Sequence, residues 1–97
     1  MGEPSLAAYI GQNLRRVRSQ VGISQEEVGI RSGLHRTEIG LLERGERLPR
    51  IDTLLKLAGA LSVKFEGPLL EGIEWQPGSV QRGTFTLPID PVEEDNP

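Results

Sequence analysis

Residues Ser24 to Gly45 read Ser-Gln-Glu-Glu-Val-Gly-Ile-Arg-Ser-Gly-Leu-His-Arg-Thr-Glu-Ile-Gly-Leu-Leu-Glu-Arg-Gly. Ser24 and Glu27 have the spacing of a capping box, in which the hydroxyl accepts from the amide of the third helical residue and the carboxylate reaches back. Gly33 permits the positive φ that a tight turn between two helices needs. The stretch therefore predicts two short helices and the turn between them, over residues 25–31, 36–44 and 32–34.

Helical periodicity extends this pattern on both sides. Before the quoted stretch, apolar residues predict an amphipathic helix over about 5–20: Leu6, Ile10, Leu14, Val17 and Val21. After it, a second set predicts a helix over about 51–61: Leu54, Leu57, Ala58 and Leu61. A short fifth helix is expected within 63–70, where Gly67-Pro68 interrupts the pattern.

Gly29 lies inside the predicted helix 25–31, where glycine costs about 1 kcal/mol relative to alanine. We interpret this glycine as the point at which the helix over 36–44 approaches closely. Val28, Ile39 and Leu42 are the residues that these two helices are expected to bury.

The sequence changes character after residue 72. Segments 73–75 and 84–87 are β-prone and partly alternating, and a turn-rich Gln-Pro-Gly-Ser follows the first of them. Because an isolated hairpin is marginal in water, we expect it to pack on the helices or on a second subunit. The predicted division is a helical domain, a β-hairpin and an acidic disordered tail, over residues 1–71, 72–88 and 89–97.

The composition is that of an ordinary globular protein, with 97 residues, of which 36% are hydrophobic and 26% are charged. This length suits one compact domain with an appendage. Cysteine is absent, which excludes disulfides and thiolate metal sites. A membrane-spanning apolar run and a secretion signal are both lacking, so we expect a cytoplasmic protein without membrane contact. No glycine loop for phosphate, nucleophile beside a base or metal-ligand cluster is recognisable, so we expect no enzyme, cofactor or metal.

The formal net charge of −3 is unevenly distributed. Residues 1–50 carry eight Arg and six Glu, a balance of +2, whereas residues 51–97 carry three basic and eight acidic side chains, a balance of −5. The basic side chains of the first half are all Arg, which suits bidentate contacts with phosphates and bases. Two helices joined as predicted also form a helix-turn-helix, whose second helix fits the major groove of DNA.

Five motifs lie at a consistent spacing: Leu14-Arg15-Arg16-Val17-Arg18, Gly22-Ile23-Ser24-Gln25-Glu26-Glu27, Ser32-Gly33-Leu34, Ile39-Gly40-Leu41-Leu42-Glu43-Arg44-Gly45 and the segment from Pro49 to Leu61. With these motifs, residues 10–63 resemble the phage-repressor and Cro type of bacterial helix-turn-helix domain, the type also found in xenobiotic-response-element regulators. The resemblance implies an all-α domain of five helices, to which the hairpin is an extension. It also implies a homodimer that binds an operator in double-stranded DNA.

The resemblance assigns roles to individual residues. The residues implied to face base edges are Arg36, Thr37, Glu38 and Leu41, where arginine suits guanine, a carboxylate suits cytosine N4 and leucine suits the thymine methyl. The residues implied to contact phosphates are Gln25, His35, Arg44, Arg47 and Arg50. Arg18 and Glu43 resemble the family's internal ion pair. His35 and Arg50 stand where the family commonly has a hydroxyl residue that caps a helix.

Two functions remain open at this stage. The first is a transcriptional regulator, with repression favoured, that binds a pseudo-palindromic operator as a homodimer. The second is a protein-interaction module or antitoxin-like subunit that holds a protein partner with the hairpin and tail. Trp75 and Phe85 are candidate dimer or partner contacts, with a plain hairpin core as the alternative. The surface that forms the dimer is not identified by the sequence.

Overall fold

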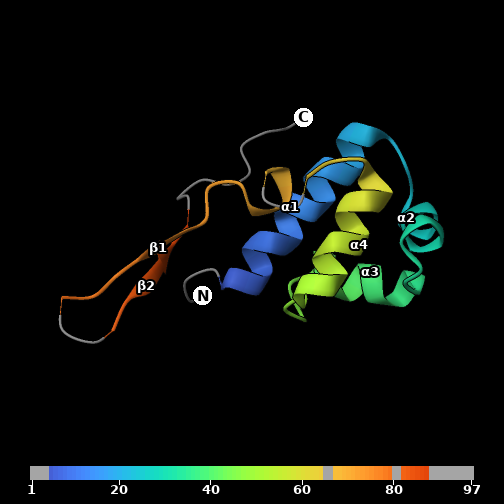
Figure 1. The fold of residues 1–97 in the computed structure, drawn as a ribbon. Coiled ribbons are helices and arrows are strands. Elements are labelled where there is room, and N and C mark those ends of the chain that lie inside the picture. The colour runs from blue at the N-terminus through green and yellow to red at the C-terminus, as the bar shows by residue number, and fades with distance from the viewer. Residues whose placement is uncertain (1–4, 65–66, 80–81, 88–97) are drawn as a thin grey trace.

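The computed structural model describes residues 5–64, 67–79 and 82–87. Four α-helices come first, followed by a 3₁₀ turn and two short strands (Figure 1). They are α1 (Leu6–Val21), α2 (Gln25–Ser32), α3 (Arg36–Glu43), α4 (Ile51–Leu61), η1 (Pro68–Leu70), β1 (Glu74–Gln76) and β2 (Thr84–Thr86).

Capping residues set the helix bounds. The Ser24 hydroxyl accepts from the Glu27 amide at 3.0 Å, as the capping box predicts. The other half of the predicted capping box is not formed, because the Glu27 carboxylate does not reach back to Ser24 but pairs with Arg31 Nε at 2.9 Å, one turn further along α2. Gly22 and Gly33 end α1 and α2 with φ of 86° and 79°, a left-handed conformation that glycine adopts without steric cost. The four predicted helices therefore occur with bounds shifted by no more than about one residue.

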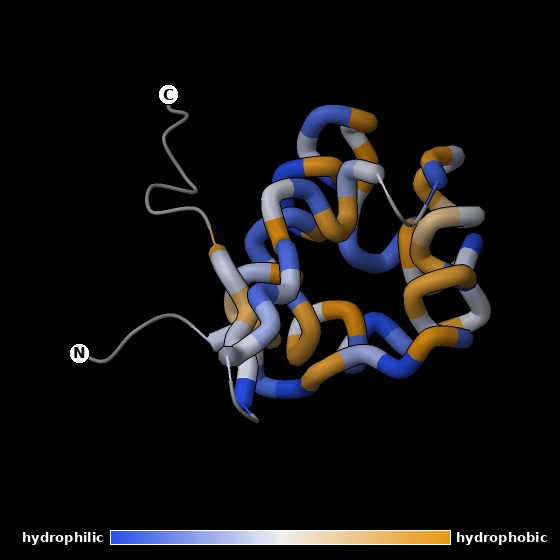
Figure 2. The backbone as a smooth tube through the Cα atoms, turned by 60° about the vertical axis from the view of Figure 1, so that its left-hand side comes forward, coloured by the Kyte–Doolittle hydropathy of each residue, from blue (hydrophilic) through white to orange (hydrophobic). Residues whose placement is uncertain are grey.

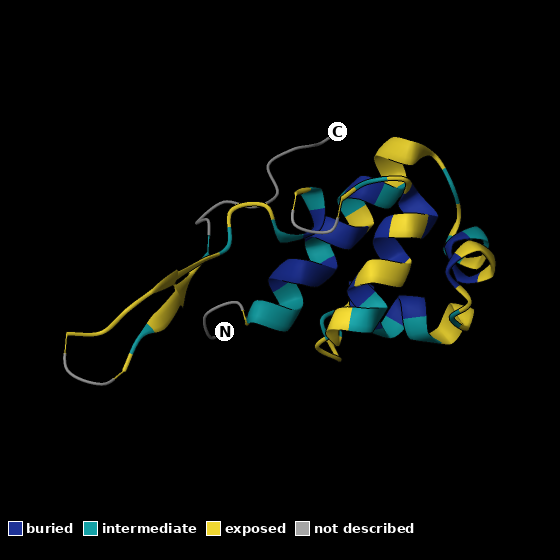
Figure 3. Ribbon diagram, viewed as in Figure 1, coloured by how far each residue is buried: buried dark blue, intermediate teal, exposed yellow. Residues whose placement is uncertain are grey.

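The core lies between the helices, and apolar and polar residues follow one another along the helical part of the chain (Figure 2). The side chains with the least exposure come from all four helices and from η1: Leu14, Val17, Val28, Ile39, Leu42, Leu57, Leu61 and Leu69. Burying a residue of this size contributes about 1.5–3 kcal/mol, so this cluster is the main source of stability. In Figure 3 the buried positions of α1, α3 and α4 lie on the sides that these helices turn toward one another.

Glycine allows two close approaches between helices. A Cβ on Gly29 would lie 2.8 Å from the Leu34 carbonyl oxygen and 3.3 Å from the Arg36 amide nitrogen. The predicted close approach of α3 at this glycine is confirmed. A Cβ on Gly11 would lie 2.3 Å from the Leu42 carbonyl oxygen, so α1 and α3 also cross with their backbones nearly in contact.

The fifth helix expected within 63–70 is not confirmed. Ser62 ends α4 in the left-handed conformation, and the described residues that follow form only the single turn of η1. Pro68 is the first residue of that turn, because proline fixes φ and has no amide hydrogen for a longer helix. The turn still contributes to packing. Leu69 is fully buried, and its carbonyl accepts from Asn13 Nδ2 on α1 at 3.0 Å.

The predicted hairpin is present as an antiparallel pair in which Trp75 faces Phe85. The two rings meet edge to face, with centroids 5.1 Å apart and an interplanar angle of 73°. All residues of β1 and β2 are exposed, and the hairpin projects away from the helices (Figures 1 and 3). It is thus not packed on the helical core, one of the two expected locations. The predicted tail at 89–97 lies outside the described residues, and the division at 71 and 88 stays a prediction.

Candidate nucleic-acid interface

One side of α3 is turned to solvent. Arg36 and Thr37 are exposed and Leu41 is partly exposed, whereas Ile39 and Leu42 on the opposite side are buried. The hairpin extends from the side of the molecule away from α2 (Figure 1). The predicted base-contacting residues therefore share an accessible helical face, and the helix is held in place by its other face.

His35 caps the start of α3. Its Nδ1 accepts from the Thr37 amide at 3.0 Å, and its backbone is extended as an N-cap requires. A ring nitrogen thus replaces the hydroxyl expected at this position. Because a neutral imidazole has one acceptor and one donor, Nε2 is then the nitrogen that carries the hydrogen. The exposed ring can donate from Nε2 while it caps the helix.

A buried polar cluster connects α1, α2 and α3. The Glu43 carboxylate accepts from Arg18 Nε at 2.5 Å, from Arg18 Nη2 at 3.1 Å and from Gln25 Nε2 at 3.0 Å. Arg18 also donates to the Ile23 carbonyl at 2.9 Å. The side chains of Glu43 and Arg18 are only 4% and 16% exposed. Gln25 thereby gives one amide hydrogen to this cluster.

The three arginines between the end of α3 and the start of α4 each have a carboxylate partner. Arg44 pairs with Glu46 at 2.9 Å, and Arg50 pairs with Asp52 at 2.9 Å. Arg47 pairs with Glu38, a residue predicted to contact a base, at 2.5 Å. These arginine side chains are between 54% and 81% exposed. In contrast, the Arg36 side chain has no ion-pair or hydrogen-bond partner among the described residues.

Two of these pairs shift ionisation. The hydrogen bond and charge of Glu46 raise the pKa of Arg44, and the same contacts lower the pKa of the Glu46 carboxyl. At Asp52, desolvation acts to raise the pKa. The hydrogen bond and charge of Arg50, together with the Thr53 backbone hydrogen bond and the charge of Lys56, outweigh it, so the pKa of Asp52 is lowered. Glu46 and Asp52 therefore stay ionised to a lower pH than unpaired carboxyl groups would.

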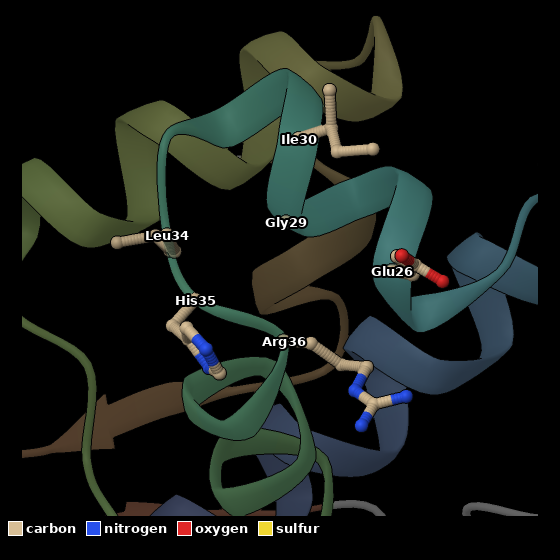
Figure 4. Close-up of a pocket in the computed structure, with 6 residues that line it drawn as sticks. All are labelled: Glu26, Gly29, Ile30, Leu34, His35 and Arg36. Carbon is tan, nitrogen blue, oxygen red and sulfur yellow. The ribbon is translucent and has the colours of Figure 1, made fainter.

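A hollow of about 420 Å³ lies at the junction of α2 and α3 (Figure 4). It is lined by Glu26, Gly29, Ile30, Leu34, His35 and Arg36. Ile30 is 70% exposed, and the Ile30 and Arg36 side chains point in different directions (Figure 4). Sequence reasoning did not identify Glu26 or Ile30. The signal was present, because neither residue shares the helical face of buried Val28.

Trp75 and Phe85 contact each other on the hairpin, and β1 and β2 project away from α3 (Figure 1). Within the described ranges, no group of three or more His, Cys, Asp or Glu side chains is placed to hold a metal ion. None of the helices described is both long and apolar enough to cross a membrane.

A family model described as helix-turn-helix matches residues 14–67. A relative from Sinorhizobium fredii, an uncharacterised HTH-type transcriptional regulator named y4dJ, is 46% identical over 54 residues, which cover 56% of this chain and 70% of that protein. The control protein C.BamHI from Bacillus amyloliquefaciens is 40% identical over 61 residues, covering 62% of this chain and 75% of the relative. The crystal structure of the restriction-modification controller protein C.AhdI from Aeromonas hydrophila superposes with a TM-score of 0.62 at 40% identity, covering 65% of this chain and 94% of that one.

Proposed function

The chain belongs to the helix-turn-helix family of DNA-binding transcriptional regulators, and we propose that it is a repressor that binds a pseudo-palindromic operator as a homodimer. The observation that carries this proposal is the solvent-facing side of α3, which begins at the unpartnered Arg36. The names of two relatives, a control protein and a restriction-modification controller protein, support a regulatory role. Regulators of this family are not enzymes.

In this proposal α3 enters the major groove and Arg36 binds guanine through O6 and N7. Such a bidentate contact is worth about 1–3 kcal/mol of discrimination between bases. Arg36 suits this role because no carboxylate has to be displaced before it binds. Thr37 and Leu41 contact neighbouring base edges, with Leu41 placed against a thymine methyl.

Phosphates on both sides of the groove are held by neutral donors and by arginines. His35 donates from Nε2 while its Nδ1 caps α3. Gln25 donates with the amide hydrogen that Glu43 does not take, at the N-terminus of α2, where the helix dipole also favours an anion. Arg44 and Arg50 exchange their exposed carboxylate partners for phosphates, which costs little because exposed ion pairs are weak.

The two copies are proposed to meet through α4. Leu48, Ile51 and Leu55 are 53%, 62% and 52% exposed, and the last two are one turn apart on the same helix. An apolar strip of this kind is a candidate contact surface in a protein of this size. To bind two half-sites, the proposed dimer has to present its two α3 helices about one DNA turn, roughly 34 Å, apart.

Selection of bound duplexes from a random pool, followed by size analysis of the complex, tests the regulator proposal. An inverted-repeat consensus with two chains bound is the expected result. Arg36→Ala should lose preference at one base pair of each half-site, by about 1–3 kcal/mol. Leu55→Lys should yield a monomer with an unchanged helical spectrum. A failure to enrich any sequence would refute the proposal.

A second function, binding of a protein partner, is favoured by the exposed hairpin. Trp75 and Phe85 are 55% and 47% exposed on a two-stranded ribbon, which is marginal in water without a covering surface. Trp75→Ala with Phe85→Ala should then abolish co-purification of a partner and leave DNA binding intact. Loss of dimers instead would assign the hairpin to self-association.

A further inference from the structure

The ion pair between Glu38 and Arg47 differs from its two neighbours. In the pairs of Arg44 and Arg50 the partner lies two residues away in sequence, outside α3. Glu38, however, lies in the first turn of α3 and reaches Arg47 nine residues further on, in the linker before α4. Of these three carboxylates, Glu38 is the one on the helix proposed to enter the major groove.

A carboxylate in that position needs a donor. An ionised carboxylate can only accept hydrogen bonds, and next to DNA it also faces the charge of the phosphates. Arg47 supplies the donor in the free chain, where the Glu38 side chain is 24% exposed and that of Arg47 is 54% exposed. In the major groove, the amino group of cytosine N4 can supply it instead. Glu38 can therefore have one of two partners, and its choice decides whether Arg47 is free.

We propose that Glu38 is a specificity-determining residue that makes the phosphate contact of Arg47 conditional on the base beside α3. This inference rests on the proposed DNA-binding function. On a duplex that places a cytosine amino group beside Glu38, the carboxylate turns to the base and Arg47 moves to a phosphate. On any other duplex, Glu38 keeps Arg47, and this phosphate contact is not made.

The proposal has a measurable consequence in salt dependence. Each phosphate that a protein neutralises on duplex DNA adds about −0.9 to the slope of log K against log salt concentration. Arg47 should therefore contribute one such increment on the duplex recovered by selection and none on a random-sequence duplex of equal length. At 0.1 M salt, an increment of this size corresponds to about eightfold in the association constant relative to 1 M.

The experiment measures binding of the full chain to both duplexes over a salt series. In Arg47→Ala, the slope should become less negative by about 0.9 on the selected duplex and stay unchanged on the random one. In Glu38→Gln, Arg47 is always free, so the slope on the random duplex should be steeper by about 0.9, and the affinity relative to the unmodified chain should rise about eightfold from 1 M to 0.1 M salt. The double variant should lose that gain. Glu74→Gln and Arg82→Ala on the hairpin make the same charge changes as controls and should leave both slopes unchanged.

Each outcome separates this inference from the function on which it rests. If the unmodified chain shows no salt-dependent binding to either duplex, the regulator proposal itself fails. If the chain binds but Arg47→Ala makes both slopes less steep by the same amount, Arg47 is an unconditional contact and the inference is overturned. A gain in Glu38→Gln that persists in the double variant, or that equals the Glu74→Gln effect, overturns it as well. Because exposed ion pairs contribute little to stability, both variants should keep the helical spectrum, which circular dichroism checks.

Discussion

Replacement of Glu43 by alanine should destabilise the domain more than any change on the exposed face of α3. The carboxylate accepts three hydrogen bonds, two from Arg18 and one from Gln25, and its side chain is 4% exposed. Removing it leaves the Arg18 guanidinium, 16% exposed, without its counter-ion. Breaking a buried pair from one side costs about 3–5 kcal/mol, because the remaining charge is uncompensated.

That cost is large for a chain of this size. Total stability of a small domain is about 5–15 kcal/mol, so Glu43→Ala removes a large share of it. For a domain of 60–100 residues each kcal/mol corresponds to about 4–8 °C in Tm, which places the expected decrease at roughly 12–40 °C. Thermal and urea unfolding followed by circular dichroism measure it. All variants are compared at one protein concentration, because dimerisation would make Tm depend on concentration.

A double variant distinguishes loss of the pair from loss of packing. Arg18→Met with Glu43→Leu removes both charges and fills the space with apolar atoms, which is often neutral or stabilising for a buried pair. Most of the lost stability should return. A Tm decrease of only a few degrees in Glu43→Ala, or a double variant as unstable as the single one, would refute the view that the uncompensated charge carries the cost.

Three further outcomes are expected. Gly11→Ala should lower the free energy of unfolding by about 1–3 kcal/mol, because its Cβ would lie 2.3 Å from a backbone oxygen of α3. Gly59→Ala, which has open space around it, should raise the free energy of unfolding by about 0.5–1 kcal/mol. Urea unfolding measures both. His35→Ala should cost about 1 kcal/mol in thermal unfolding through loss of the α3 cap, and His35→Ser should restore it. Because Arg44 lowers the pKa of Glu46, the pair stabilises the folded state at pH values above the ordinary pKa of a Glu side chain. This contribution is lost as the pH falls through the lowered pKa. Glu46→Gln should therefore reduce stability at neutral pH and leave it unchanged in strong acid; an equal effect at both pH values would contradict this.

The helices could be predicted because local signals agree with the tertiary structure. Apolar spacing located α1 and α4, and Ser24, Gly22 and Gly33 set the ends of α1 and α2 through backbone geometry that depends only on nearby residues. Even the close approach at Gly29 could be inferred, because a glycine inside a helix has a cost that packing must offset. The expected fifth helix is wrong for the converse reason: the apolar residues favour a helix, but Pro68 prevents one from continuing through that segment.

The exposed side chains could not be predicted in the same way. The sequence indicates that Arg47 lies near α3, but its pairing with Glu38, nine positions earlier, depends on the path of the linker after α3. The sequence marks His35 as a departure from the expected cap, yet only the structure shows a ring nitrogen in the role of the hydroxyl. Such contacts depend on the relative positions of elements, and amino-acid spacing does not record these positions.

Burial determines which ion pair can serve as a probe of DNA binding. Glu43 holds Gln25, a proposed phosphate contact, so any change at Glu43 alters the fold and the interface together. A loss of DNA binding in Glu43→Ala would therefore say nothing about how α3 selects a base. Glu38 lies in an exposed pair whose loss costs little stability, and its partner is on the same surface. A change in DNA binding at Glu38 with an unchanged Tm must then arise from the interface, which is why the salt series on Glu38 and Arg47 variants can separate recognition from folding.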